Sequence, residues 1–227
     1  MMTELMHLLQ LSDSALPVGT FTFSNGIETA SACGKVKDEA TLECYLHTLL
    51  RQTAWSDGIA ALHAFRATQR DDYSEVLLSD ATLMACKPHA ENRAMLLRMG
   101  RKLAELNQAL CPTKMNERWL DDIRKAKTPG SYPVTQALIC AESGLNEKRL
   151  FCLITYGTCS LMLNAALRQI RISHLATQNI LWQAADTIES LYERINTCTL
   201  DDIRSFAPMA DIWASMHEKG AMRMFAN

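Results

Sequence analysis

The chain has 227 residues, 48% of them hydrophobic and 21% charged, and its formal net charge at pH 7 is −2. This length and apolar fraction can build one substantial core, and no low-complexity linker divides residues 1–227, so a single domain is expected. The small net charge, without a run of basic residues, excludes general electrostatic attraction to nucleic acid or to an anionic membrane.

The first seven residues carry the acid Glu4 and no basic leader or long apolar run, so they do not read as a signal peptide and a cytoplasmic location is expected. Eight cysteines lie at positions 33, 44, 86, 111, 140, 152, 159 and 198. Because none of them forms a CxxC pair, they are expected to be reduced and mostly buried as small hydrophobic side chains.

The spacing of apolar residues predicts an all-α chain of about eight to ten helices, because these residues recur at intervals of three and four almost throughout. A helix is predicted over 38–53, with Gly34 ending the helix before it. Pro88 is expected to open a helix that runs to Leu110 and closes before Pro112.

The second half of the chain begins with a predicted loop at 128–133 and a short helix that ends at Gly144. Asn146 is expected to cap the most apolar segment, 150–167, which has no charge between Arg149 and Arg168. Polar residues interrupt this segment too often for a membrane span, so a central helix covered on all sides by other helices is predicted. A turn near Ile172 and Ser173, a helix over 180–195, a capping box at Thr199 and Asp202 and a break at Pro208 complete the prediction.

Motifs that carry chemistry are missing from the sequence. No GxxxxGK[ST] phosphate loop occurs, and the His217–Glu218 pair lacks the second histidine of a zinc-protease helix, since Ala221 stands one turn on. Cys152 and Cys159 share one helix face, but they are read as core residues and not as ligands. No catalytic residue, bound metal or cofactor is therefore expected.

Two stretches at opposite ends of the chain are unusual for a helical protein. Residues 14–28 combine Pro17, Gly19 and Gly26 with Phe21 and Phe23, which fits either a recognition loop or an N-terminal segment packed on the core. At the C-terminus the apolar pattern continues to the last residues, where termini normally become polar. This second feature predicts a tail that binds a partner.

These stretches carry a resemblance to the UreF family of urease accessory proteins. Residues 16–28, LPVGTFTFSNGIE, are similar to the family signature LPVGGFxxSxGLE, although Thr20 replaces a glycine. Residues 91–93 and 99–101 resemble a mid-chain family segment, and 156–178 resembles the family's long helix and the turn after it. In that turn, residues 172–175 depart from the usual Pro and Gly-Gln pattern. Residues 211–225 resemble the C-terminal pattern that ends in Arg-Leu-Phe.

The resemblance implies an all-helical, non-enzymatic protein in nickel insertion. Its expected partners are a second copy of the chain, the accessory protein UreD (also called UreH), the GTPase UreG and apo-urease. The resemblance assigns partner or dimer contacts to the signature loop (residues 14–28) and to the C-terminal tail (residues 215–227), and assigns GTPase contact to Arg168. The residues carried over are Pro17, Gly19, Phe21, Gly26, Glu28, Arg168, Met216, His217, Glu218, Arg223 and Phe225.

Two other functions stay open at the level of sequence. A helical metal-dependent hydrolase would assemble a site from His174, His217, Glu218 and buried cysteines. A nickel carrier would bind the metal through surface histidines.

Overall fold

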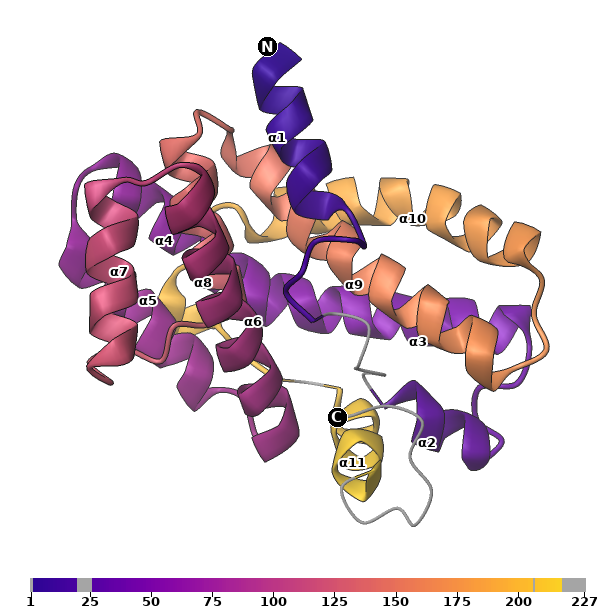
Figure 1. Ribbon diagram of the computed structural model, residues 1–227. Coiled ribbons are helices and arrows are strands. Elements are labelled where there is room, and N and C mark those ends of the chain that lie inside the picture. The colour runs from indigo at the N-terminus through magenta and orange to yellow at the C-terminus, as the bar shows by residue number, and fades with distance from the viewer. Residues whose placement is uncertain (1, 20–25, 206, 218–227) are drawn as a thin grey trace.

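The computed structural model describes residues 2–19, 26–205 and 207–217, and within these ranges every regular element is helical (Figure 1). The all-α prediction is therefore confirmed. The first half contains α1 (Met2–Ser12), α2 (Ile27–Ala32), α3 (Glu39–Thr53), the π-helical segment η2 (Ala54–Gly58), α4 (Ile59–Gln69), α5 (Tyr73–Ala85) and α6 (Ala90–Leu110). The second half contains α7 (Lys114–Arg124), α8 (Tyr132–Glu142), α9 (Glu147–Gln169), α10 (His174–Ile195), the 3-10 turn η3 (Leu200–Asp202) and α11 (Pro208–His217).

Helix α9 lies at the centre and packs against α1, α2, α3, α4, α8 and α10. It is long and apolar enough to cross a membrane, but 56% of its most apolar window is buried against other helices, as in the core helix of a soluble protein. Its cover is less complete than predicted. Cys152, Tyr156 and Asn164 are exposed at intervals of one or two turns, with the half-buried Ser160 between them. We call these four residues the open face of α9.

The predicted helix ends are largely confirmed by their caps. Asp38 accepts a hydrogen bond from the backbone N–H of Thr41 (3.0 Å), and Asn146 accepts one from Arg149 (2.9 Å). Thr199 and Asp202 form the predicted box, although it caps the 3-10 turn η3 and not an α-helix. Such side-chain acceptors satisfy N–H groups that have no partner within the helix.

Prolines shift two predicted boundaries. Helix α6 begins at Ala90, two residues after Pro88, with His89 at its N-cap. Tyr132 and Pro133, predicted to be loop, form the first turn of α8. Proline is tolerated there because the first turn needs no intrahelical N–H donor.

The loop between α7 and α8 is held by buried Asp80 of α5. Its carboxylate accepts hydrogen bonds from Thr128 Oγ1 (2.7 Å) and from the backbone N–H groups of Gly130 (2.7 Å) and Ser131 (2.9 Å). Gly100 of α6 lies so close that a Cβ there would overlap the carbonyl oxygen of Gly130. The mid-chain segment 99–101 therefore has a packing role.

The expectation that most cysteines are buried is wrong. Only Cys140 and Cys159 of the eight are buried, and burial raises the pKa of each thiol to about 12. Cys152, predicted to be core, is exposed on the open face of α9. Cys33 and Cys111 follow helix C-termini at the surface, where residue type alone does not determine burial. All eight thiols are free.

Candidate partner-binding surface formed by both ends of the chain

The described start of the signature loop is a compact turn after α1. Asp13 Oδ1 accepts a hydrogen bond from the N–H of Ala15 (2.8 Å), and the N–H of Val18 donates to the carbonyl of Leu16 (2.7 Å). Val18 is buried in a small cluster with Met95, Leu96 and Met99 of α6 and Ile139 of α8, whereas Pro17 and Gly19 are exposed. The loop is thus anchored through Val18, while its proline and first glycine face outward.

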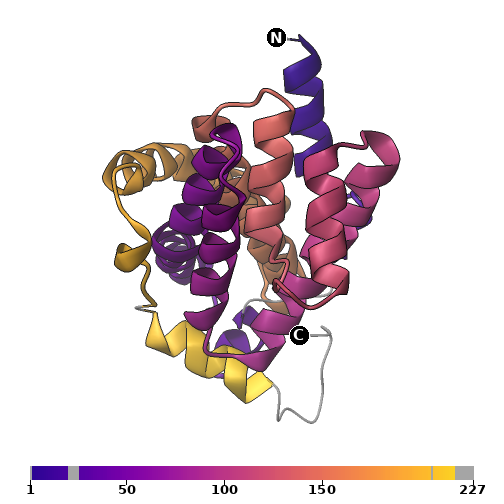
Figure 2. The same ribbon diagram turned by 90° about the vertical axis from the view of Figure 1, so that its left-hand side faces the viewer.

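Gly26 brings the other end of the signature loop against the C-terminal helix. Its φ of +79° is left-handed, and a Cβ there would lie 3.0 Å from Tyr45 Oη, 3.2 Å from the carbonyl oxygen of Ala210 and 3.3 Å from the nitrogen of Ala214. Figure 2 shows α11 at one end of the bundle, and α11 packs against both α2 and α6. The two unusual stretches, almost 200 residues apart in sequence, therefore touch.

Helix α11 is attached to the rest of the helices by an aromatic contact and by polar contacts of Asp211. The rings of Tyr45 and Trp213 lie 5.6 Å apart, His89 Nε2 lies 3.5 Å from Asp211 Oδ1, and Ser205 Oγ donates to Asp211 Oδ2 (2.8 Å). Burial, and then the charge of Asp211, raise the pKa of Tyr45 far above its usual value, so the phenol stays neutral. The inner side of α11 is thereby fixed.

The outer side of α11 is apolar and open to solvent. Met209 is 49% exposed, Ile212 47% and Met216 49%. Their spacing of three and four residues places them along one stripe of the helix. A stripe of this kind on a helix whose other side is already packed is typical of a protein-binding surface.

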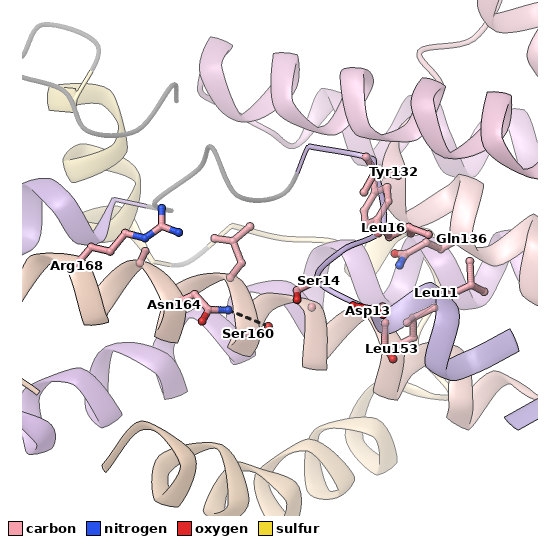
Figure 3. Close-up of a pocket in the computed structure, with 15 residues that line it drawn as sticks. Leu11, Asp13, Ser14, Leu16, Tyr132, Gln136, Leu153, Ser160, Asn164 and Arg168 are labelled. Carbon is pink, nitrogen blue, oxygen red and sulfur yellow. Dashed lines mark hydrogen bonds between the residues drawn. The ribbon is translucent and has the colours of Figure 1, made fainter. Parts of the chain in front are cut away.

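Arg168 lies at the other side of the signature loop. It lines one end of a pocket that Leu16 and Val18 of the loop, Tyr132 and Gln136 of α8 and the α9 residues Gly157, Ser160 and Asn164 also line. Figure 3 shows Arg168 at one end of this pocket and Leu11 and Gln136 at the other, with the hydrogen bond from Asn164 to Ser160 (3.3 Å) between them. The open face of α9 thus forms part of the pocket wall.

A second pocket adjoins the first and contains a feature that the sequence did not predict. Both pockets share Tyr132, Gln136 and Gly157, and the second reaches α11 at Asp211 and a buried ion pair between Lys87 and Asp57. Lys87 Nζ also lies 3.1 Å from Ser56 Oγ. Asp57 and Ser56 belong to the π-helical segment η2, whose irregular backbone leaves no periodic signal in the sequence.

Arg93, within the family-like segment 91–93, is a structural residue here. Its guanidinium donates to the backbone carbonyls of Lys87 (2.6 Å) and Pro88 (2.8 Å). It therefore fixes the turn that carries Lys87 toward Asp57.

The predicted site residues that the structure describes gather around this surface. Pro17 and Gly19 lie in the loop, Gly26 and Glu28 at the start of α2, Arg168 near the end of α9 and Met216 on α11. Helix α2 contacts both α9 and α11, so it joins these parts. Phe21, Glu218, Arg223 and Phe225 lie outside the described residues, and of His217 only the helical backbone is described.

Among the described residues, no three or more His, Cys, Asp or Glu side chains lie together in a group that could hold a metal ion. The side chain of His217 and all of Glu218, both part of the hydrolase hypothesis, lie outside what the structure describes.

The family model and two similar proteins indicate the same family. The UreF family model matches residues 36–185, which leaves out the signature loop and the C-terminal tail. The chain is 43% identical over 223 residues to urease accessory protein UreF 2 of Brucella canis, covering 98% of this chain and 92% of that protein. It is 36% identical over 225 residues to urease accessory protein UreF of Yersinia enterocolitica, covering 99% of both chains.

Proposed function

The chain belongs to the UreF family of urease accessory proteins, and on this premise we propose that it is a non-catalytic scaffold for nickel insertion into apo-urease. In this role it binds a UreD/UreH-type accessory protein, recruits the UreG-type GTPase and gates its hydrolysis of GTP in the cytoplasm. Nucleotide and nickel are handled by the GTPase.

The observation that carries this proposal is the apolar stripe of α11 beside the signature loop. Met209, Ile212 and Met216 expose apolar area on a helix that Tyr45, His89 and Gly26 hold in place from the other side. Methionine adapts its shape to a partner surface. We assign this stripe, with the tail that follows it, to the UreD/UreH-type partner.

The open face of α9 supports homodimer formation. Tyr156 is 37% exposed, and a Cβ at Gly157 would meet no atom within 4 Å. A central helix is normally covered on all sides by neighbouring helices. A second copy of the chain would cover the open face of α9 through a two-fold contact between identical surfaces. We assign contact with the GTPase to Arg168, one turn beyond Asn164.

The test is co-purification of the UreD/UreH-type protein from the same organism with three forms of the chain. These are the full-length chain, a form ending at His217, and the triple variant Met209→Ser, Ile212→Ser and Met216→Ser. The control is Leu78→Ser on α5, which removes a side chain that is also 50% exposed. We expect the control to bind like the full-length chain, and the truncated and triple forms to lose the complex while circular dichroism shows unchanged helicity.

Two results would contradict the proposal. Equal binding by all forms would move the interface to another part of the helical body. Failure of the full-length chain to bind the UreD/UreH-type protein, the GTPase or apo-urease would remove the scaffold role itself.

A further inference from the structure

Helix α10 exposes two large apolar side chains on its outer side. Trp182 is 85% exposed and Leu175 71%. They are seven residues apart, so both lie on the side of α10 that faces away from α9 and α3, against which the helix packs. In Figure 1, α10 borders the side of the molecule opposite α7.

Three acidic residues continue the same line along the helix. Asp186, Glu189 and Glu193 follow Trp182 at intervals of four, three and four residues and are exposed. No ion pair involves these three carboxylates in the ranges that the structure describes. We call Leu175, Trp182, Asp186, Glu189 and Glu193 the α10 stripe.

These three acids reduce the stability of helix α10 in the isolated chain. Like charges three or four residues apart on a helix repel each other. Glu193 also lies in the last turn of α10, where the helix dipole disfavours negative charge. The isolated chain therefore gains nothing from this arrangement, and departures from locally favourable sequence are expected at functional sites.

We propose that the α10 stripe is a second docking surface, for a partner protein that presents an apolar recess to Trp182 and Leu175 and Lys or Arg side chains to the three acids. The charge decides the kind of partner, since three carboxylates oppose a nucleic acid or an anionic membrane. This inference rests on the proposed function, which supplies the candidate partners. It adds a site on the flank opposite α7, separate from α11 and the signature loop.

A second copy of the chain is the less favourable occupant. The basic residues Lys125 and Lys127 after α7 are already paired with Asp121 (2.6 Å) and Asp122 (3.1 Å). A contact between α10 of one copy and the opposite flank of the next would also be head to tail, which produces rings or open chains and not a two-fold dimer.

The test separates binding from stability. The variants are Trp182→Ala and Glu189→Lys, and the controls are Leu78→Ala on α5 and Glu117→Lys on α7, which remove an exposed leucine and reverse an exposed acid elsewhere. Binding of each full-length variant to the purified UreD/UreH-type protein, the GTPase and apo-urease is measured by calorimetry at low and high salt, and Tm is measured for each variant alone.

We expect both stripe variants to weaken one of the three complexes at least about tenfold, as loss of an interface hot spot does. The effect of Glu189→Lys should shrink at high salt because the lost attraction is screened. In the free chain Glu189→Lys should raise Tm by about 1 °C, because it relieves repulsion worth a few tenths of a kcal/mol.

The inference is overturned if both stripe variants bind like the controls, or if Glu189→Lys lowers the Tm of the free chain, which would make the acids structural. If the unmodified chain forms a complex but the stripe variants are neutral, the proposed function stands and only this inference falls. If the unmodified chain binds none of the three proteins, both fall together.

Discussion

At the scale of single residues, one glycine, Gly26, lies at the contact between the signature loop and α11. Gly26→Ala should destabilise the fold by at least about 1 kcal/mol more than Gly19→Ala, because only the first change forces a Cβ against Tyr45, Ala210 and Ala214. Both glycines have φ near +80°, so both variants carry the left-handed cost of about 1 kcal/mol. Urea unfolding followed by tryptophan fluorescence measures the difference, and equal losses would show that α11 does not pack on Gly26.

Gly100 should tolerate an added Cβ even less than Gly26 does. Gly100→Ala is expected to cost about 3 kcal/mol, at the upper end of the range for overpacking, because the obstacle is the backbone of Gly130 and not a flexible side chain. The control is Gly157→Ala, which also lies within a helix. A Cβ at Gly157 would meet no atom within 4 Å, so this change should stabilise the free chain by up to about 1 kcal/mol. A Tm change of the same sign in both variants would contradict the close approach of α6 to the loop.

Residue roles were predictable from sequence only where they depend on local structure. Asn146 and Thr199 cap as predicted, because a cap is decided within four residues. The exposure of Cys44 and Cys152 was not predictable, since it depends on which face of a helix meets a neighbour. The contact partners of Gly26 and Gly100 were missed for the same reason.

At the scale of elements, Glu147 joins three helices. It accepts hydrogen bonds from Arg66 Nε of α4 (2.7 Å) and Tyr192 Oη of α10 (2.7 Å). The hydrogen bond from Arg66, followed by that from Tyr192, lowers the pKa of the Glu147 carboxyl, although burial opposes this. A lowered pKa stabilises the fold above the unfolded value, about 4.3, and this contribution disappears as the pH falls through the folded pKa.

Glu147→Gln should therefore reduce the free energy of unfolding at pH 7, and the difference from the unmodified chain should narrow as the pH falls below about 4. The control is Glu105→Gln, whose pKa is also lowered, mainly by the hydrogen bond from Arg101, but whose ion pairs are at the surface. It should change stability little at either pH. A constant difference across the pH range for Glu147→Gln would refute the linkage.

The π-helical segment η2 depends on a buried charge pair with the turn before α6. Lys87→Met should destabilise the chain by about 3–5 kcal/mol, because Asp57 would remain buried without its partner. Adding Asp57→Asn should restore most of that loss, since both charges are then gone. Urea unfolding of the two single variants and the double variant tests this, and simple additivity would argue against the pair.

The helices themselves were largely predictable because the apolar period of 3.6 residues repeats along each one. The segment Ala54–Gly58 was not predicted, since one wider turn between α3 and α4 leaves the apolar pattern almost intact. The pair of Lys87 and Asp57 was invisible in sequence because it joins residues 30 positions apart through that turn.

At the scale of the whole molecule, the composition and period predicted one all-α body, but not that its two ends meet. The signature loop and α11 converge because α2 packs on both α9 and α11, a long-range arrangement that no local pattern encodes. The incomplete cover of α9 is a property of the same arrangement. The resemblance assigns partner contacts to both stretches, and α2 connects the helix that carries Arg168 with the helix that carries Met216.

The proposed homodimer gives a test of this architecture. Gly157→Arg adds a large cation beside the open face of α9, where the single chain has room for it because a Cβ meets no atom within 4 Å. The free chain should keep its helicity and its Tm within about 2 °C, since arginine is a better helix former than glycine. A dimer that uses this face should dissociate, because the interface would bury an unpaired charge. Light scattering after size exclusion measures the mass, with Glu117→Arg on α7 as the control, and an unchanged dimer would place the two-fold contact on another helix.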